Sequence, residues 1–141
     1  MSTVLMRDVR DVMEKDVLSV EENTSAFDVL KKMVDRKVWS VLVTRKGLPI
    51  GVMTERDFIR RCIMSGLDSK TTPVGKLMSS PLITIEPGAP IGQALALMID
   101  KQVRRLYVVQ NGKIVGRVTQ TGLLDNTINM FRALSEAWTA I

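Results

Sequence analysis

A threonine and an aspartate stand three residues apart in the segment Gly51-Val-Met-Thr-Glu-Arg-Asp57, where a β-type run gives way to a helical one. Thr54 and Asp57 can therefore point into the same cleft at a strand-to-helix junction. A carboxylate accepts two hydrogen bonds from a vicinal diol such as that of ribose, and the free N–H groups of a helix start attract phosphate. The alternative is that the two residues only cap the helix.

Composition excludes several other chemistries. The 141 residues contain no histidine and one cysteine, which rules out a Ser-His-Asp triad, a Cys-His pair, histidine-ligated zinc and an internal disulfide. The sequence offers no nucleophile-base pair and no metal cluster, so we expect no enzyme activity, no metal and no required cofactor. The net charge of +5 favours an anionic partner, but it is spread along the chain without a basic tail.

The start of the chain and its apolar runs bear on location. The segment from Met1 to Arg10 lacks an apolar run long enough for a signal peptide. No stretch approaches the roughly 20 apolar residues of a membrane span. We therefore expect a cytoplasmic protein that does not contact a membrane.

The elements that position Thr54 and Asp57 occur twice. At an offset of 65 residues, 11 of the 51 positions from 9 to 59 are identical, among them Val9/Val74, Gly51/Gly116 and Thr54/Thr119. The polar segment 66–73, with a glycine and a proline at its ends, is typical of a linker. The chain is therefore predicted to be an internal duplication.

Each copy has the same order of expected elements. A short strand (17–20) precedes a helix opened by Ser25-x-x-Asp28, and apolar residues at i, i+3, i+4, i+7 and i+8 indicate one buried face. The second copy repeats this face, with Pro90 in the first turn. Strands 41–43 and 50–54, and 106–109 and 114–119, are joined by Lys46-Gly47 and Asn111-Gly112, which favour tight hairpins. A second helix closes each copy, at 57–64 and 123–138.

These patterns predict an α+β fold of two β-α-β-β-α repeats packed around a pseudo-two-fold axis, because one such repeat cannot bury its sheet alone. The predicted boundaries are 7–65 for the first repeat, 66–73 for the linker and 74–127 for the second repeat. Residues 128–141 extend the last helix. Its apolar positions from Leu124 to Trp138 exceed what a peripheral helix needs, which favours a contact between two copies.

The sequence resembles the CBS (cystathionine β-synthase) domain family, in particular its tandem pairs, called Bateman modules. The resemblance rests on Gly51-Val-Met-Thr-Glu-Arg-Asp57-Phe58, which is similar to the family pattern Gly-x-x-Thr-x-x-Asp, and on Met13 to Val20, and it covers about residues 7 to 125. It implies clefts between the repeats that bind AMP, ADP, ATP or an S-adenosyl compound, with ligand occupancy modulating a partner protein.

The resemblance also implies roles for individual residues. Thr54 and Asp57 would hold the ribose, and a set of residues around them would line the adenine pocket, namely Asp16, Val17, Leu18, Val38, Trp39 and Ser40. Arg104 and Arg105 resemble a basic dipeptide that reaches phosphate, and Arg56 and Thr121 at the helix starts are further phosphate candidates. The alternatives are core packing for the apolar residues, a solvated strand edge for Arg104 and Arg105, and a surface role for Arg56 and Thr121.

The second copy departs from the family pattern, because Gly122 stands where the offset requires the counterpart of Asp57. We therefore expect one competent site and a second, weaker one with Leu82, Ile83, Val103 and Thr119. The leading hypothesis is a non-catalytic sensor that acts as a homodimer on an unknown protein in trans. The alternative is a nucleic-acid-binding protein on the same scaffold, which the aromatic content of 4% and the diffuse charge disfavour.

Overall fold

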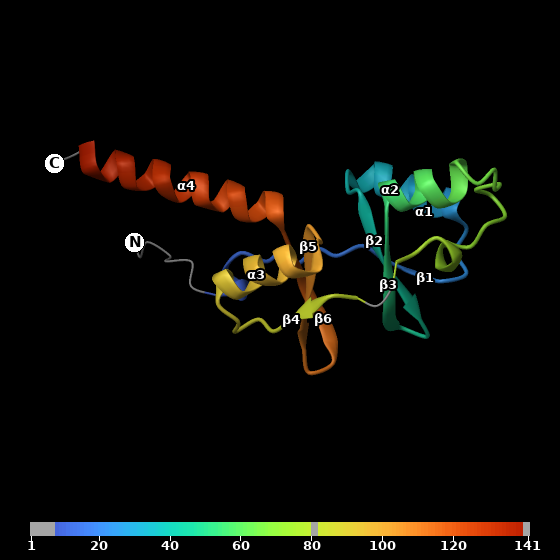
Figure 1. Ribbon diagram of the computed structural model, residues 1–141, viewed down its shortest axis with the longest axis horizontal. Helices are drawn as coiled ribbons and strands as arrows, with labels where there is room; N and C mark the ends of the chain where they lie inside the picture. Colours follow the sequence, from blue (N-terminus) through green and yellow to red (C-terminus); the bar gives the residue numbers. More distant parts are fainter. Residues whose placement is uncertain (1–7, 80–81, 140–141) are drawn as a thin grey trace. The chain divides into compact units, whose positions relative to one another are not determined.

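Two three-stranded sheets with the same topology form the framework of the protein (Figure 1). The computed structural model describes residues 8–79 and 82–139. In the first sheet, β1 (Ser19–Glu21) runs parallel to β2 (Ser40–Arg45), which pairs antiparallel with β3 (Leu48–Thr54). In the second, β4 (Thr84–Ile85), β5 (Arg105–Gln110) and β6 (Lys113–Thr119) repeat this arrangement. The predicted α+β class and the duplicated element order are confirmed.

In each unit, one amphipathic helix connects the two parallel strands of the sheet. Helix α1 (Ala26–Arg36) begins where predicted, and the Ser25 hydroxyl accepts a hydrogen bond from the Asp28 N–H at 3.2 Å. Its counterpart α3 (Ile91–Lys101) begins one residue after Pro90, which is the N-cap rather than part of the first turn. The predicted periodicity places Val29 and Met33 of α1, and Ala94 and Met98 of α3, in the two cores.

The hairpin turns have the backbone that the sequence favours. Lys46 and Gly47 have φ values of 51° and 78°, and Asn111 and Gly112 have values of 53° and 75°. Two consecutive positive φ angles define a type I′ turn, whose twist matches that of the flanking strands. These turns return β3 and β6 along their partners and bring Thr54 and Thr119 to the starts of the following helices.

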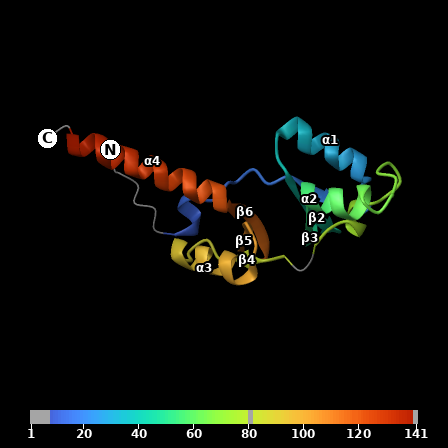
Figure 2. The same cartoon turned by 45° about the horizontal axis from the view of Figure 1, so that its top comes forward.

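The closing helices differ from the predicted ranges. Helix α2 (Glu55–Phe58) is followed by a π-helical turn, η2 (Ile59–Ile63), in which the Met64 N–H donates to the Ile59 carbonyl at 2.9 Å. Helix α4 (Gln120–Thr139) is longer than predicted at its start and projects away from the sheet of its own unit in both views (Figure 1 and Figure 2). None of the helices in the described ranges is long and apolar enough to cross a membrane.

The two compact units do not coincide with the two sequence repeats. Of the described residues, one unit comprises 16–79 and 82, and the other combines 8–15 with 83–139. The opening turn of the second repeat, η3 (Val74–Lys76), buries Val74 in the core of the unit 16–82. The opening turn of the first repeat, η1 (Val9–Asp11), buries Val9 in the core of the other unit.

Backbone hydrogen bonds hold these opening turns in equivalent ways. The Val9 N–H donates to the Ala89 carbonyl at 2.9 Å, and the Val74 N–H donates to the Thr24 carbonyl at 2.8 Å. Both pairs are related by the 65-residue offset. Each repeat therefore contributes its opening turn to the unit that carries the sheet of the other repeat.

The predicted linker packs against α1. The Thr72 carbonyl accepts from the Ala26 N–H at 2.8 Å, and the Ser69 carbonyl accepts from the Phe27 N–H at 3.0 Å. These bonds satisfy N–H groups of the first helical turn that no intrahelical carbonyl can reach. Thr72 is buried as a result.

Candidate functional site

Three segments of the unit 16–82 meet where β2 begins and β3 ends. Ser40 pairs with Thr54 across the two strands, and the Glu55 N–H donates to the Trp39 carbonyl at 3.1 Å. Residues 16–18 precede β1 on the other side of β2, where the Leu18 carbonyl accepts from the Leu42 N–H at 2.9 Å. We call this region, residues 16–18, 38–40 and 54–57, the Asp57 end of the sheet.

Thr54 and Asp57 form a reciprocal capping box at the start of α2. The Asp57 N–H donates to Thr54 Oγ1 at 3.1 Å, while the Thr54 N–H donates to Asp57 Oδ2 at 3.0 Å. The Thr54 hydroxyl donates to the same Oδ2 at 3.1 Å. The capping role that the sequence left as an alternative is therefore present in the structure.

The Asp57 carboxylate is buried and has one more donor. Only 7% of Asp57 is exposed, and the Ser79 hydroxyl donates to Oδ1 at 3.3 Å. A carboxylate offers about four lone-pair sites, so three hydrogen bonds leave roughly one site open. A vicinal diol, which needs two, would have to replace the Ser79 hydroxyl.

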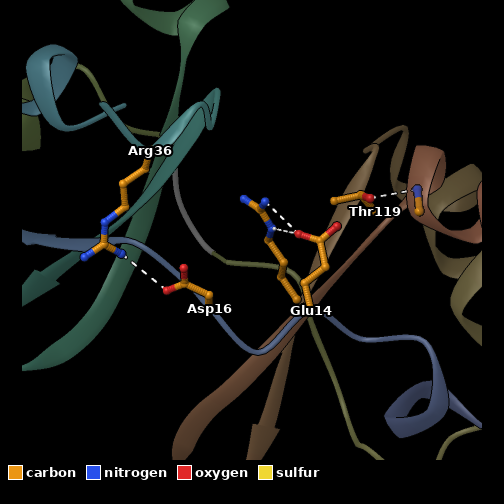
Figure 3. A network of polar contacts seen from close by, with 6 residues as sticks. Glu14, Asp16, Arg36 and Thr119 are labelled. Atoms are coloured by element: carbon orange, nitrogen blue, oxygen red, sulfur yellow. Dashed lines mark hydrogen bonds and ion pairs between the residues drawn. The ribbon is translucent and has the colours of Figure 1, made fainter. Parts of the chain in front are cut away.

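The other predicted residues of this end differ widely in exposure. Leu18 and Ser40 are buried, and Leu18 belongs to the core, as the packing alternative expects. Val17 and Val38 are half-buried, whereas Trp39 is 56% exposed. Asp16 and Arg56 are exposed, and Asp16 forms a surface ion pair with Arg36 at 3.3 Å (Figure 3). The half-buried and exposed apolar side chains are those available to a ligand.

The second sheet has an equivalent end, made of residues 82–83, 103–105 and 119–122, which we call the Thr119 end. Arg105 pairs with Thr119, and the Arg104 carbonyl accepts from the Gln120 N–H at 2.9 Å. The Ile83 carbonyl accepts from the Tyr107 N–H at 3.0 Å. Leu82, Ile83 and Val103 are half-buried, and Arg104 and Thr121 are exposed.

Thr119 retains its capping role without an aspartate partner. Its hydroxyl accepts from the Gly122 N–H at 3.0 Å, as Thr54 accepts from Asp57. No side chain extends from Gly122, which leaves the second end without the carboxylate of the first. The departure read from the sequence is therefore visible as an incomplete capping box.

A different acid, Glu14, lies near this position and was not predicted. A Cβ built on Gly122 would lie 3.6 Å from Glu14 Oε1 and 2.9 Å from Thr119 Oγ1. Glu14 Oε2 pairs with Arg117 at 2.8 Å, and the backbones of these two residues exchange hydrogen bonds of 2.8 and 2.9 Å (Figure 3). The signal was in the repeat, because the 65-residue offset maps Glu14 onto Ser79, the residue that contacts Asp57.

The single cysteine of the chain, Cys62, is buried, and this affects its thiol. Burial raises the pKa of the Cys62 thiol above its ordinary value of 9.0, and the negative charge of Asp68 raises the pKa further. The thiol contacts the Leu67 carbonyl at 3.6 Å. Cys62 is thus a protonated core residue at neutral pH.

Fold and site together define a duplicated α+β protein with one buried carboxylate at the strand-to-helix junction of one unit. The chain belongs to the CBS domain family, whose model matches residues 9–63 and 74–128.

The chain is also similar to individual proteins and to a solved structure. The chain is 31% identical over 124 residues to the CBS domain-containing protein YhcV of Bacillus subtilis, covering 88% of each chain. It is 35% identical over 119 residues to an uncharacterised protein of Methanopyrus kandleri, covering 83% of this chain and 61% of that protein's length. A crystal structure of an uncharacterised conserved protein from Pyrococcus horikoshii superposes with a TM-score of 0.80 at 31% identity, over 86% of this chain and 92% of that one.

Proposed function

We propose that this chain is a non-catalytic sensor whose Asp57 end binds an adenine nucleotide (AMP, ADP or ATP) or an S-adenosyl compound. Proteins with paired CBS domains are generally regulatory modules. The observation that carries the proposal is the buried Asp57 carboxylate, held beside Thr54 by neutral donors. Since none of these donors is a cation, no ion pair among them competes with a ligand for this carboxylate.

The ligand would be held by two kinds of contact. Its ribose diol would replace the Ser79 hydroxyl and use the acceptor site that remains on Asp57. Its adenine would pack on the accessible apolar side chains Val17, Val38 and Trp39. The roles of Arg104, Arg105, Arg56 and Thr121 in phosphate binding stay predictions.

The regulatory output would reach a separate protein in trans, through a homodimer of this chain. Replacement of the Ser79 hydroxyl by a ribose hydroxyl would release the Ser79 side chain from Asp57. The backbone of Ser79 pairs with Val52 through hydrogen bonds of 2.7 and 3.0 Å. Ligand occupancy would thereby act on the segment that leaves η3. No catalytic step is part of this proposal.

Calorimetry with ATP, ADP, AMP and S-adenosylmethionine tests the proposal. Asp57→Asn keeps the size of the side chain and an acceptor for the Thr54 N–H, but removes the charge. We expect a ribonucleotide to bind about ten- to a hundredfold more weakly, which corresponds to about 1.5–3 kcal/mol of charge-assisted hydrogen bonding. A 2′,3′-dideoxynucleotide should lose much less.

The matched control is Asp28→Asn. Asp28 occupies the third position of α1, as Asp57 does in α2, but it is exposed, so its replacement should leave affinity unchanged. Equal losses for the ribo and dideoxy ligands would contradict the diol contact. If no adenine compound binds and a short single-stranded oligonucleotide binds with steep salt dependence, the nucleic-acid alternative holds instead.

A further inference from the structure

Helix α4 carries a row of large apolar side chains that face solvent. They are Leu124, Ile128, Phe131, Leu134 and Trp138, with exposed fractions of 59%, 45%, 70%, 56% and 79%. The last three lie beyond residue 128, where the family match ends. An apolar surface of this size on a projecting helix is typical of an interaction site. We call these five residues the α4 stripe.

The spacing of the α4 stripe is symmetric about Phe131. Leu124 and Trp138 lie seven residues before and after it, and Ile128 and Leu134 lie three residues before and after it. With about 3.6 residues per turn, all five side chains fall within roughly 60° of Phe131 around the helix axis. A helix turned end for end presents the same pattern, so the stripe is complementary to a reversed copy of itself.

A cavity lies beside the N-terminal half of the stripe, within the same unit. Its volume is about 360 Å³. It is lined mainly by apolar side chains of α3, α4 and the residue after η1, namely Val12, Ile91, Leu95, Gln120, Leu123, Leu124 and Thr127. On α4, Leu123 and Thr127 lie on the same edge of the stripe as Trp138. An antiparallel two-fold pairing of helices brings equal edges together, whereas a parallel pairing brings opposite edges together.

The charged residues of α4 leave that edge free. Asp125, Arg132 and Glu136 all lie on the other edge of the stripe, at about 100° to 140° from Phe131. The edge with the cavity and Trp138 therefore carries no ionisable group of α4. Apolar contact there needs no desolvation of a charge from this helix.

We propose that two copies of this chain pair through antiparallel α4 helices, with Phe131 at the two-fold axis and Trp138 of each copy in the α3–α4 cavity of the other. The inference deepens the homodimer in the proposed function and does not depend on its ligand. The exposed area of the stripe is on the order of 600 Å² per copy, or roughly 1,200 Å² for the pair, which reaches the range of stable interfaces.

Tryptophan fluorescence tests the pairing directly. The chain has two tryptophans, so Trp39→Phe leaves Trp138 as the only one. We expect its emission to shift to the blue as protein concentration rises and dimers form in sedimentation velocity. Adding Phe131→Asp should abolish both changes, and Leu95→Gln in the cavity should weaken the dimer about tenfold or more. Ala133→Asp, on the opposite face of α4, is the control and should leave the dimer intact.

Cysteine cross-linking tests the direction. In a Cys62→Ala background, chains with Leu124→Cys and chains with Trp138→Cys should form a mixed disulfide when combined. These two positions lie within about 20° of Phe131 around the helix axis and reach the same level in the antiparallel pair. Efficient self-cross-linking of each variant alone would indicate a parallel pair and overturn the proposal.

The outcome also separates this inference from the proposed function. A dimer that survives Phe131→Asp but is lost in Ile63→Asp, at an exposed residue of the other unit, would place the interface elsewhere and refute the α4 pairing alone. A wild-type chain that is monomeric at all concentrations would refute both the pairing and the homodimer. Nucleotide binding measured on chains that retain Trp39 reports on the ligand independently.

Discussion

The exchange of opening turns predicts which half of the molecule each buried valine stabilises. Val74 and Val9 are both completely buried, Val74 in the core of the unit 16–82 and Val9 in the core of the other unit. Replacement of either by alanine removes two methyl groups. At about 0.8 kcal/mol for each carbon, plus the cavity left behind, the cost is about 2 kcal/mol.

Hydrogen exchange under native conditions measures this loss of stability separately in the two units. In Val74→Ala, we expect amides of α1 and β2 to exchange about thirtyfold faster, since each 1.4 kcal/mol is a factor of ten. Amides of β5 and β6 should keep their rates. Val9→Ala should show the reverse pattern.

Val34→Ala is the control for local effects, because Val34 is a valine of α1 with 62% of its surface exposed, and it should change stability by less than about 0.5 kcal/mol. If Val74→Ala accelerated exchange in the β5–β6 hairpin rather than in α1 and β2, the assignment of η3 to the unit 16–82 would be refuted. Equal acceleration everywhere would show that the two units open only together.

Three further predictions concern single positions. Gly51→Ala should cost about 1–3 kcal/mol in urea unfolding, because its Cβ would lie 2.7 Å from a main-chain oxygen, whereas Gly92→Ala has open space and should be neutral or stabilising. Burial raises the pKa of Cys62, so its alkylation should stay slow up to pH 9 in the folded protein, and its contribution to stability should decline above that pH; fast alkylation at pH 8 would contradict this. Gly122→Asp should lower the melting temperature and add no nucleotide affinity, since the new carboxylate would meet Glu14, and a gain in affinity would show that this carboxylate is tolerated.

Local structure was predictable where one short segment determines it. The hairpins follow from Lys46-Gly47 and Asn111-Gly112, and the helix faces follow from the spacing of apolar residues, because both depend on neighbours in the chain. The π-helical turn after Phe58 was not predictable, since an apolar pattern does not report which carbonyl each N–H selects. The exchange of opening turns between the two units was not predictable for a related reason. Val9 and Val74 look equally apolar whichever core they enter.

The candidate site was predictable only in part for the same physical reason. The Thr54–Asp57 capping box spans three residues and is encoded locally, so its geometry matches the capping alternative that the sequence left open. The contact of Ser79 with Asp57 spans 22 residues, and the pair of Glu14 with Arg117 spans 103. Contacts of that span depend on tertiary packing, which spacing along the chain does not encode.

The acids of the two units differ in the partner that each carboxylate contacts, which is neutral in one unit and a cation in the other. In the unit 16–82 the acid is Asp57, and its partner, from the segment after the opening turn η3, is the neutral Ser79. In the other unit the acid is Glu14, from the segment after the opening turn η1. Glu14 forms an ion pair with Arg117, and Gly122 takes the place of Asp57. An ion-paired carboxylate is a weaker acceptor for an uncharged hydroxyl than one held by neutral donors, because the cation already satisfies its charge. Within the residues described, no cation pairs with Asp57. This asymmetry supports a single competent diol site, at Asp57, although both units place a carboxylate near the start of their closing helix.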